Sequence, residues 1–194
     1  MKVVDISAWQ TDVDWQALKD YGIEGVIIKL GEKQNLDEMF FYHVNKAVEY
    51  GMKYGVYYYG HASTIDEARR EAYQVDNWIK TYIRGENPEL GIWYDAEDTS
   101  MLAGINNVVY PIANFVHTLR NIGYNYVGIY SFYNWLTNVI DLKPLPKDVP
   151  IWVAQYYKEN SFTLENPDRI CKIWQYTDRE KISNMLLDCN IYYD

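Results

Sequence analysis

The stretch LGIWYDAED, from Leu90 to Asp98, decides how the rest of the chain is interpreted. Its apolar part predicts a buried strand, and this strand ends in acidic residues. Side chains on a strand alternate between its two faces, so Asp95 and Glu97 point in the same direction. Repulsion between two close carboxylates raises one pKa, which makes one group an acid and leaves the other ionised. Glycoside hydrolases use such a pair, although acids at a strand end can also simply open a loop or cap a helix.

Strand-like and helix-like segments alternate through most of the chain. We expect strands at 3–7, 25–30, 53–59, 90–97 and 127–131, and helices at 14–22, 37–50, 64–79, 109–122 and 132–139. Three further strands, 150–156, 170–176 and 185–192, follow a proline-rich link without a long helix between them. The alternation implies βαβ units and a parallel sheet. We therefore predict an α/β fold: one irregular, mostly parallel β/α barrel domain over 1–194, with about eight strands and five helices.

Composition excludes several classes of partner. The net charge of −9 argues against binding to nucleic acid or to anionic membranes. No apolar run is long enough to span a membrane, and the first residues lack a secretory signal, so we expect synthesis in the cytoplasm. His43 and His117 fall within predicted helices, and we predict no metal site. Cys171 and Cys189 match no zinc pattern, and both free thiols and a disulfide remain open.

Polar residues recur where the predicted strands end. In a β/α barrel the chemistry collects at the carboxyl ends of the strands. The residues expected there are Asp5, Lys29, Tyr57, Tyr59, Asp95, Glu97, Tyr130, Gln155, Gln175 and Asp188. The meeting of these residues at one edge favours a catalytic role for Asp95 and Glu97 over a loop or capping role. The chain also has 20 Tyr and 7 Trp, and rings beyond those that the core needs would suit stacking on sugars.

Short blocks along nearly the whole chain carry a family resemblance. The sequence resembles family 25 glycoside hydrolases, the Chalaropsis-type lysozymes of bacteria and phages. The matching blocks are 5–10 (DISAWQ), 26–29 (VIIK), 55–57 (GVY), 95–97 (DAE), 128–131 (GIYS), 151–156 (IWVAQY), 173–176 (IWQY) and 187–188 (LD). Residues 31–33 and 58–61 depart from the family's pattern at two loops that would border the glycan groove.

The resemblance implies cleavage of the β-1,4 bond between N-acetylmuramic acid and N-acetylglucosamine in peptidoglycan, without a cofactor. Glu97 would be the general acid, and Asp95 would stay ionised beside it. Asp5 and Asp188 would frame the same pocket and tune the pair. The saccharide would be bound by Tyr57, Tyr59, Tyr130, Trp152, Gln155 and Gln175, although Trp152 could equally be barrel packing.

We expect a monomer that acts on glycan strands of the bacterial cell wall after its release from the cell. Two alternatives remain open. One is another β-glycosidase such as a chitinase, although a chitinase carries further acids where Ile92, Trp93 and Tyr94 stand here. The other is a catalytically weak glycan-binding module on the same barrel. Retention and inversion of the sugar's configuration both remain open as well.

Overall fold

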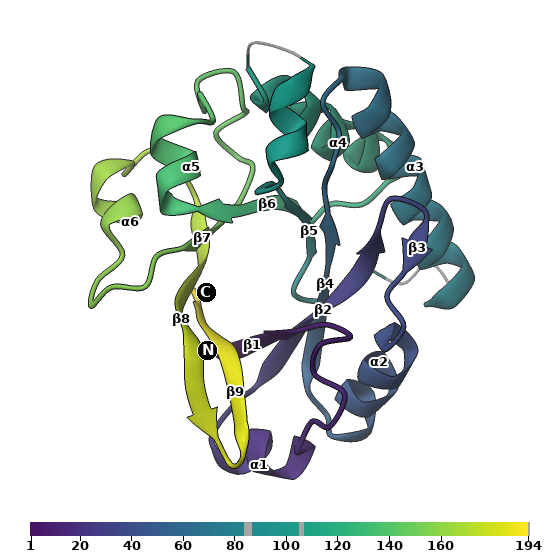
Figure 1. Ribbon diagram of the computed structural model, residues 1–194, viewed down its shortest axis with the longest axis vertical. Helices are drawn as coiled ribbons and strands as arrows, with labels where there is room; N and C mark the ends of the chain where they lie inside the picture. The colour runs from purple at the N-terminus through teal and green to yellow at the C-terminus, as the bar shows by residue number, and fades with distance from the viewer. Residues whose placement is uncertain (84–86, 105–106, 194) are drawn as a thin grey trace.

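A closed barrel forms the centre of the computed structural model, which describes residues 1–83, 87–104 and 107–193 (Figure 1). Nine strands form one sheet in the order β1-β9-β8-β7-β6-β5-β4-β2-β3, and a further pairing of β1 with β2 closes the barrel. The strands are β1 (Lys2–Ile6), β2 (Gly25–Glu32), β3 (Asn35–Leu36), β4 (Lys53–Tyr59), β5 (Ile92–Asp95), β6 (Val127–Phe132), β7 (Ile151–Ala154), β8 (Cys171–Ile182) and β9 (Met185–Tyr192). β3 lies outside the closed ring, as a short hairpin on β2. The predicted α/β barrel is confirmed.

Helices lie around the outside of the barrel, and α3 and α4 run side by side (Figure 1). They are α1 (Trp15–Asp20), α2 (Phe40–Glu49), α3 (Ile65–Tyr82), α4 (Val109–Ile122), α5 (Tyr133–Asn138) and α6 (Ser161–Glu165), with a 3₁₀ helix at Thr99–Ala103. The sequence did not predict β3, the 3₁₀ helix or α6, because each has too few residues for a periodic pattern. No helix in the described ranges is long and apolar enough to cross a membrane.

Local capping signals explain where several helices begin. The Thr64 hydroxyl accepts a hydrogen bond from the Glu67 amide, and the Glu67 carboxylate accepts one from the Thr64 amide, so the expected capping box is present. Asp14 caps α1 through the amide of Ala17. The prediction that a helix begins at Asp37 was wrong. The Asp37 carboxylate instead accepts from the amides of Met39 and Ala8, which ties the loop after β1 to the start of α2.

The last strand runs against both of its neighbours. β9 is antiparallel to β8 and to β1, whereas the other ring pairings, from β1–β2 around to β7–β8, are parallel. A tight turn at Ser183, which has a positive φ of 54°, joins β8 to β9, and so short a link permits only an antiparallel pair. In this register Asp5 lies directly opposite Asp188. The two chain ends also meet, since the Met1 amino group donates to the carbonyl of Tyr192 (2.9 Å; Figure 1).

Two separate apolar clusters form the core. The larger one packs the outer faces of the strands against the helices, and the smaller one fills the barrel with residues that include Val3, Ile27, Trp93, Trp152 and Ile173. Because side chains alternate, the residues two positions after Val3, Trp93 and Ile173 face the same interior. The apolar cluster is therefore the floor beneath Asp5, Asp95 and Gln175. The described cysteines, Cys171 and Cys189, are both free thiols.

Candidate active site

A cavity of about 220 Å³ opens at the carboxyl ends of the parallel strands. Its lining contains every residue predicted to act in catalysis or to bind the saccharide, except Tyr59 and Gln155. The full set is Asp5, Tyr57, Asp95, Glu97, Tyr130, Phe132, Trp152, Tyr156, Gln175 and Asp188. These residues come from strands spread along the whole chain, so closure of the barrel is what brings them together.

Four carboxylates share this cavity. Asp5 and Asp188 face each other across the β1–β9 pair, Asp95 is the last residue of β5, and Glu97 follows two residues later. Asp5 and Asp95 are buried, with 8% and 6% of their surfaces exposed, whereas Glu97 and Asp188 are half-buried at the opening. The deeper pair is therefore shielded from water, and the outer pair can meet a ligand in solution.

Burial raises the pKa of all four acids. It raises the pKa of Asp5 to about 6, despite hydrogen bonds that favour its charged form, and that of Asp188 to about 8, where the charge of Asp5 adds to the effect. The pKa of Glu97 is raised by burial and then by the charge of Asp5. Loss of hydration and mutual repulsion both penalise ionised carboxylates. At neutral pH the cavity therefore holds protons as well as negative charges.

The surroundings of Asp95 bear on the expectation that it stays ionised beside Glu97. Burial, followed by the charge of Glu97, raises the pKa of Asp95 well above its ordinary value, and only Lys29 acts against this. Its Oδ1 atom is buried without a hydrogen-bond partner. Burial thus disfavours the charged form of Asp95, and no hydrogen bond at Oδ1 offsets the loss of water there.

A hydrogen-bond network fixes Asp5 from below and from the side. The side-chain amides of Gln175 and Asn190 both donate to Asp5 Oδ2, at 3.0 and 2.8 Å. The hydroxyls of Tyr130 and Tyr156 donate to Gln175 Oε1, at 3.1 and 3.0 Å, which leaves the Gln175 amide nitrogen directed at Asp5. Hydrogen bonds to a carboxylate favour its charged form, so this network opposes the effect of burial.

The indole of Trp152 is held by the same network. Its Nε1 donates to Asn190 Oδ1 at 2.8 Å, and its ring packs edge-on against Tyr130, with centroids 4.6 Å apart. Only 2% of Trp152 is exposed. Trp152 is therefore mainly barrel packing that supports the floor of the cavity, and its open face for a sugar is small.

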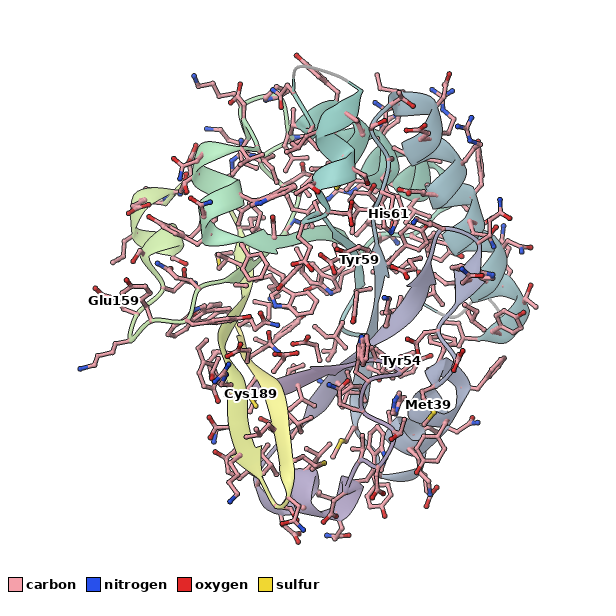
Figure 2. All side chains as sticks on the ribbon, viewed as in Figure 1. Met39, Tyr54, Tyr59, His61, Glu159 and Cys189 are labelled. Atoms are coloured by element: carbon pink, nitrogen blue, oxygen red, sulfur yellow. The ribbon has the colours of Figure 1, made fainter. Side chains whose placement is uncertain are left out.

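The two remaining predicted residues lie outside the cavity lining. Tyr59 donates to Asp98 Oδ2 (3.3 Å) and packs against the imidazole of His61, with ring centroids 5.1 Å apart; Figure 2 shows the two side by side. Gln155 uses Oε1 to accept from the amide of Ser161 (2.9 Å), at the start of α6. Strand-end position alone predicted both residues, and it does not specify how the chain turns after the strand.

Three residues of the site were missed by the sequence analysis: Phe132, Tyr156 and Asn190. Phe132 and Asn190 stand two residues after the predicted site residues Tyr130 and Asp188, and Tyr156 directly follows Gln155. Alternation along the strand would have placed Phe132 and Asn190 on the interior face. In the described part of the chain, no group of three or more His, Cys, Asp and Glu side chains is arranged to hold a metal ion. The cavity can supply protons and negative charge to a neutral ligand.

Comparisons with known proteins agree on one family. The sequence model described as "Glycosyl hydrolases family 25" matches residues 4–185. An "Autolytic lysozyme" of Clostridium acetobutylicum is 27% identical over 186 residues, which is 95% of this chain and 53% of that protein. This chain thus spans about half the length of the curated relative that it matches.

Solved structures with this fold include two that are at least 25% identical to the chain. The modular autolysin LytC from Streptococcus pneumoniae, solved in complex with a synthetic peptidoglycan ligand, is 27% identical with a TM-score of 0.86, over 99% of this chain and 46% of LytC. The catalytic domain of endolysin ply40 from bacteriophage P40 of Listeria monocytogenes is 25% identical with a TM-score of 0.81, over 100% of this chain and 93% of that domain.

Proposed function

Because this chain belongs to glycosyl hydrolases family 25, we propose that it is a peptidoglycan hydrolase of the lysozyme type. It would cleave the β-1,4 bond between N-acetylmuramic acid and N-acetylglucosamine. The observation that carries the proposal is the cavity in which Asp5, Asp95, Glu97 and Asp188 meet with raised pKa values. All four acids come from one chain, which supports action as a monomer on glycan strands of the cell wall.

Glu97 is the proton donor in this proposal. It is half-buried in the cavity wall, where a glycosidic oxygen can reach it, and burial raises its pKa, which favours the protonated form that a proton donor needs. Transfer of this proton to the leaving oxygen breaks the bond to the anomeric carbon, which becomes positively charged. An anion next to the sugar stabilises that charge.

Asp5 is the best placed acid to remain an anion. It receives hydrogen bonds from both Gln175 and Asn190, and the pKa of about 6 leaves it mostly ionised at pH 7. Asp95, whose pKa is raised well above its ordinary value by burial and then by the charge of Glu97, hydrogen-bonds the substrate beside Glu97. Asp188 completes the acidic rim opposite Asp5.

The test uses purified bacterial cell walls and identifies new reducing ends by mass spectrometry. Reducing-end muramic acid is the expected product. Cleavage of chitin without cleavage of walls would indicate a chitinase instead. Binding to walls without any new reducing ends would leave only a glycan-binding module. Glu97→Gln serves as the matched control, since it keeps the shape of the side chain and removes the proton.

A further inference from the structure

A second hollow adjoins the acid cavity and shares Phe132 and Tyr156 with it. It has a volume of about 460 Å³ and lies where β6 meets α5 and where the chain leaves β7. Its other aromatic side chains are Tyr133, Trp135 and Tyr157, and Gln155 also borders it. The two hollows therefore adjoin at the rings of Phe132 and Tyr156.

The connection between strand and helix explains why this hollow is open. β6 ends at Phe132 and α5 begins at Tyr133, so there is no loop between them, and 38% of Phe132 is exposed. After β7 the chain turns sharply, with the Tyr157 amide donating to the carbonyl of Gln155 (2.9 Å). This turn leaves Tyr157 75% exposed at the edge of the hollow. Together with the half-buried rings beside it, this exposed ring forms an apolar patch of the kind that marks a ligand-binding groove.

Aromatic rings lead from the acids into the hollow. Tyr130 and Phe132 have centroids 6.2 Å apart, and Phe132 and Tyr156 have centroids 6.4 Å apart with an edge-on geometry. None of the described residues that line the hollow is charged. A neutral ligand with flat apolar faces matches this lining, and tyrosine hydroxyls and amide groups at its edge can bind ligand hydroxyls.

The small size of the acid cavity favours a binding site beside it. Its volume of about 220 Å³ is below the roughly 300–1,000 Å³ of pockets that enclose drug-sized ligands. A glycan strand must therefore continue beyond the acids on at least one side. The uncharged aromatic hollow begins at the cavity wall, which makes it a suitable place for the next sugar.

We propose that the hollow formed by Phe132, Trp135 and Tyr157 is a saccharide subsite, which binds a sugar of the glycan strand that lies beyond the sugar held over the acids. The proposal rests on the proposed function, because it takes the ligand to be a glycan. Tyr157 contributes a stacking surface and no chemistry. Its removal weakens binding of long glycans and leaves the affinity for short ones unchanged.

The experiment measures affinity without cleavage. Glu97→Gln is the parent, and calorimetric titration gives its Kd for alternating N-acetylglucosamine and N-acetylmuramic acid oligosaccharides of two and of six sugars. In the parent, the hexasaccharide binds more tightly than the disaccharide. Adding Tyr157→Ala weakens hexasaccharide binding about fivefold, as expected for the loss of one stacked ring. Tyr157→Phe keeps the ring and restores the parent Kd.

Tyr73→Ala is the matched control for loss of an exposed tyrosine. Tyr73 lies on α3 with 55% of its surface exposed and does not border the hollow, so its removal leaves both Kd values unchanged. Equal hexasaccharide affinity in Tyr157→Ala and the parent overturns the subsite, as does a parent that gains no affinity with length. The proposed function fails separately, if the wild-type protein releases no reducing ends from walls.

Discussion

Substitution of Asp5 by asparagine is expected to make the protein more stable at pH 8, although Asp5 belongs to the acid cavity. Burial raises the pKa of Asp5 from its ordinary 3.8 to about 6. At 1.36 kcal/mol for each pKa unit, ionisation of Asp5 costs about 3 kcal/mol of folding free energy. Asparagine has the same shape and is neutral, so Asp5→Asn removes this cost and keeps an oxygen that accepts from Gln175 and Asn190.

The pH dependence has a definite sign. An acid whose pKa rises on folding binds its proton more tightly in the folded protein. Stability is therefore lost as the pH rises from about 4, where the unfolded chain ionises, to about 6, where folded Asp5 ionises. Above that range the full cost applies, and below it Asp5 is neutral in both states. Wild type and Asp5→Asn should thus differ by less than about 1 kcal/mol at pH 4 and by about 3 kcal/mol at pH 8.

Urea unfolding at pH 4, 6 and 8 measures this difference directly. Thermal unfolding should agree, because about 3 kcal/mol corresponds to a rise in Tm of roughly 6–12 °C in a protein of this size. Asp98→Asn is the control. Asp98 caps the 3₁₀ helix through the Ser100 amide (2.8 Å), and hydrogen bonds from Ser100, that of its side chain first, lower the pKa of Asp98. The same substitution there should not raise stability at pH 8.

Two results would refute the reasoning. The first is an Asp5→Asn variant that unfolds at the same urea concentration as wild type at pH 8. The second is a stability gain that persists undiminished at pH 4, since a gain independent of pH cannot come from loss of an ionisable group.

Further predictions concern the proton donor, a helix cap and a close contact in the barrel. Glu97→Gln should lower the rate of reducing-end release at least about 100-fold, with little change in Tm; near-normal activity would mean that another group donates the proton. Thr64→Ala should lower the free energy of unfolding by about 1 kcal/mol through loss of the α3 cap, and Thr64→Ser should retain most of it in the same urea titration. Gly128→Ala should cost about 1–3 kcal/mol, because its Cβ would lie 2.4 Å from the Trp93 ring and 2.6 Å from a backbone carbonyl; a Tm equal to that of wild type would contradict this.

Much of the barrel could be predicted because its signals are local. Continuous apolar runs identified the buried parallel strands, and the Thr64–Glu67 box identified the start of α3. Short elements escaped prediction, since α6 has five residues and β3 has two, too few to show a period. The helix start predicted at Asp37 was wrong because a carboxylate can either cap a helix or bind a distant amide, and Asp37 binds the amide of Ala8.

Some residues of the candidate site could be predicted from the sequence, and others could not. Period-two alternation placed Asp95 and Glu97 on one face, and the same rule, applied further, would have identified Phe132 and Asn190. It could not place Gln155, whose side chain turns towards the amide of Ser161 after β7 ends. Nor could it show which acid keeps its charge, because burial depth and hydrogen-bond partners, rather than spacing, set each pKa.

The sequence by itself determined the buried strand that the structure places at Ile92–Asp95 and the two acids at its end, Asp95 and Glu97, since these depend only on apolar patterning and backbone geometry. Only the tertiary structure decided that β9 runs antiparallel between β1 and β8, which sets Asp188 opposite Asp5 and Asn190 beneath it. It also decided that Asp95 is buried without a partner for Oδ1 and that an aromatic hollow adjoins the acids. The physical reason is that pairing between strands nearly the whole chain apart, and the loss of water that follows from it, leave no local pattern in the sequence.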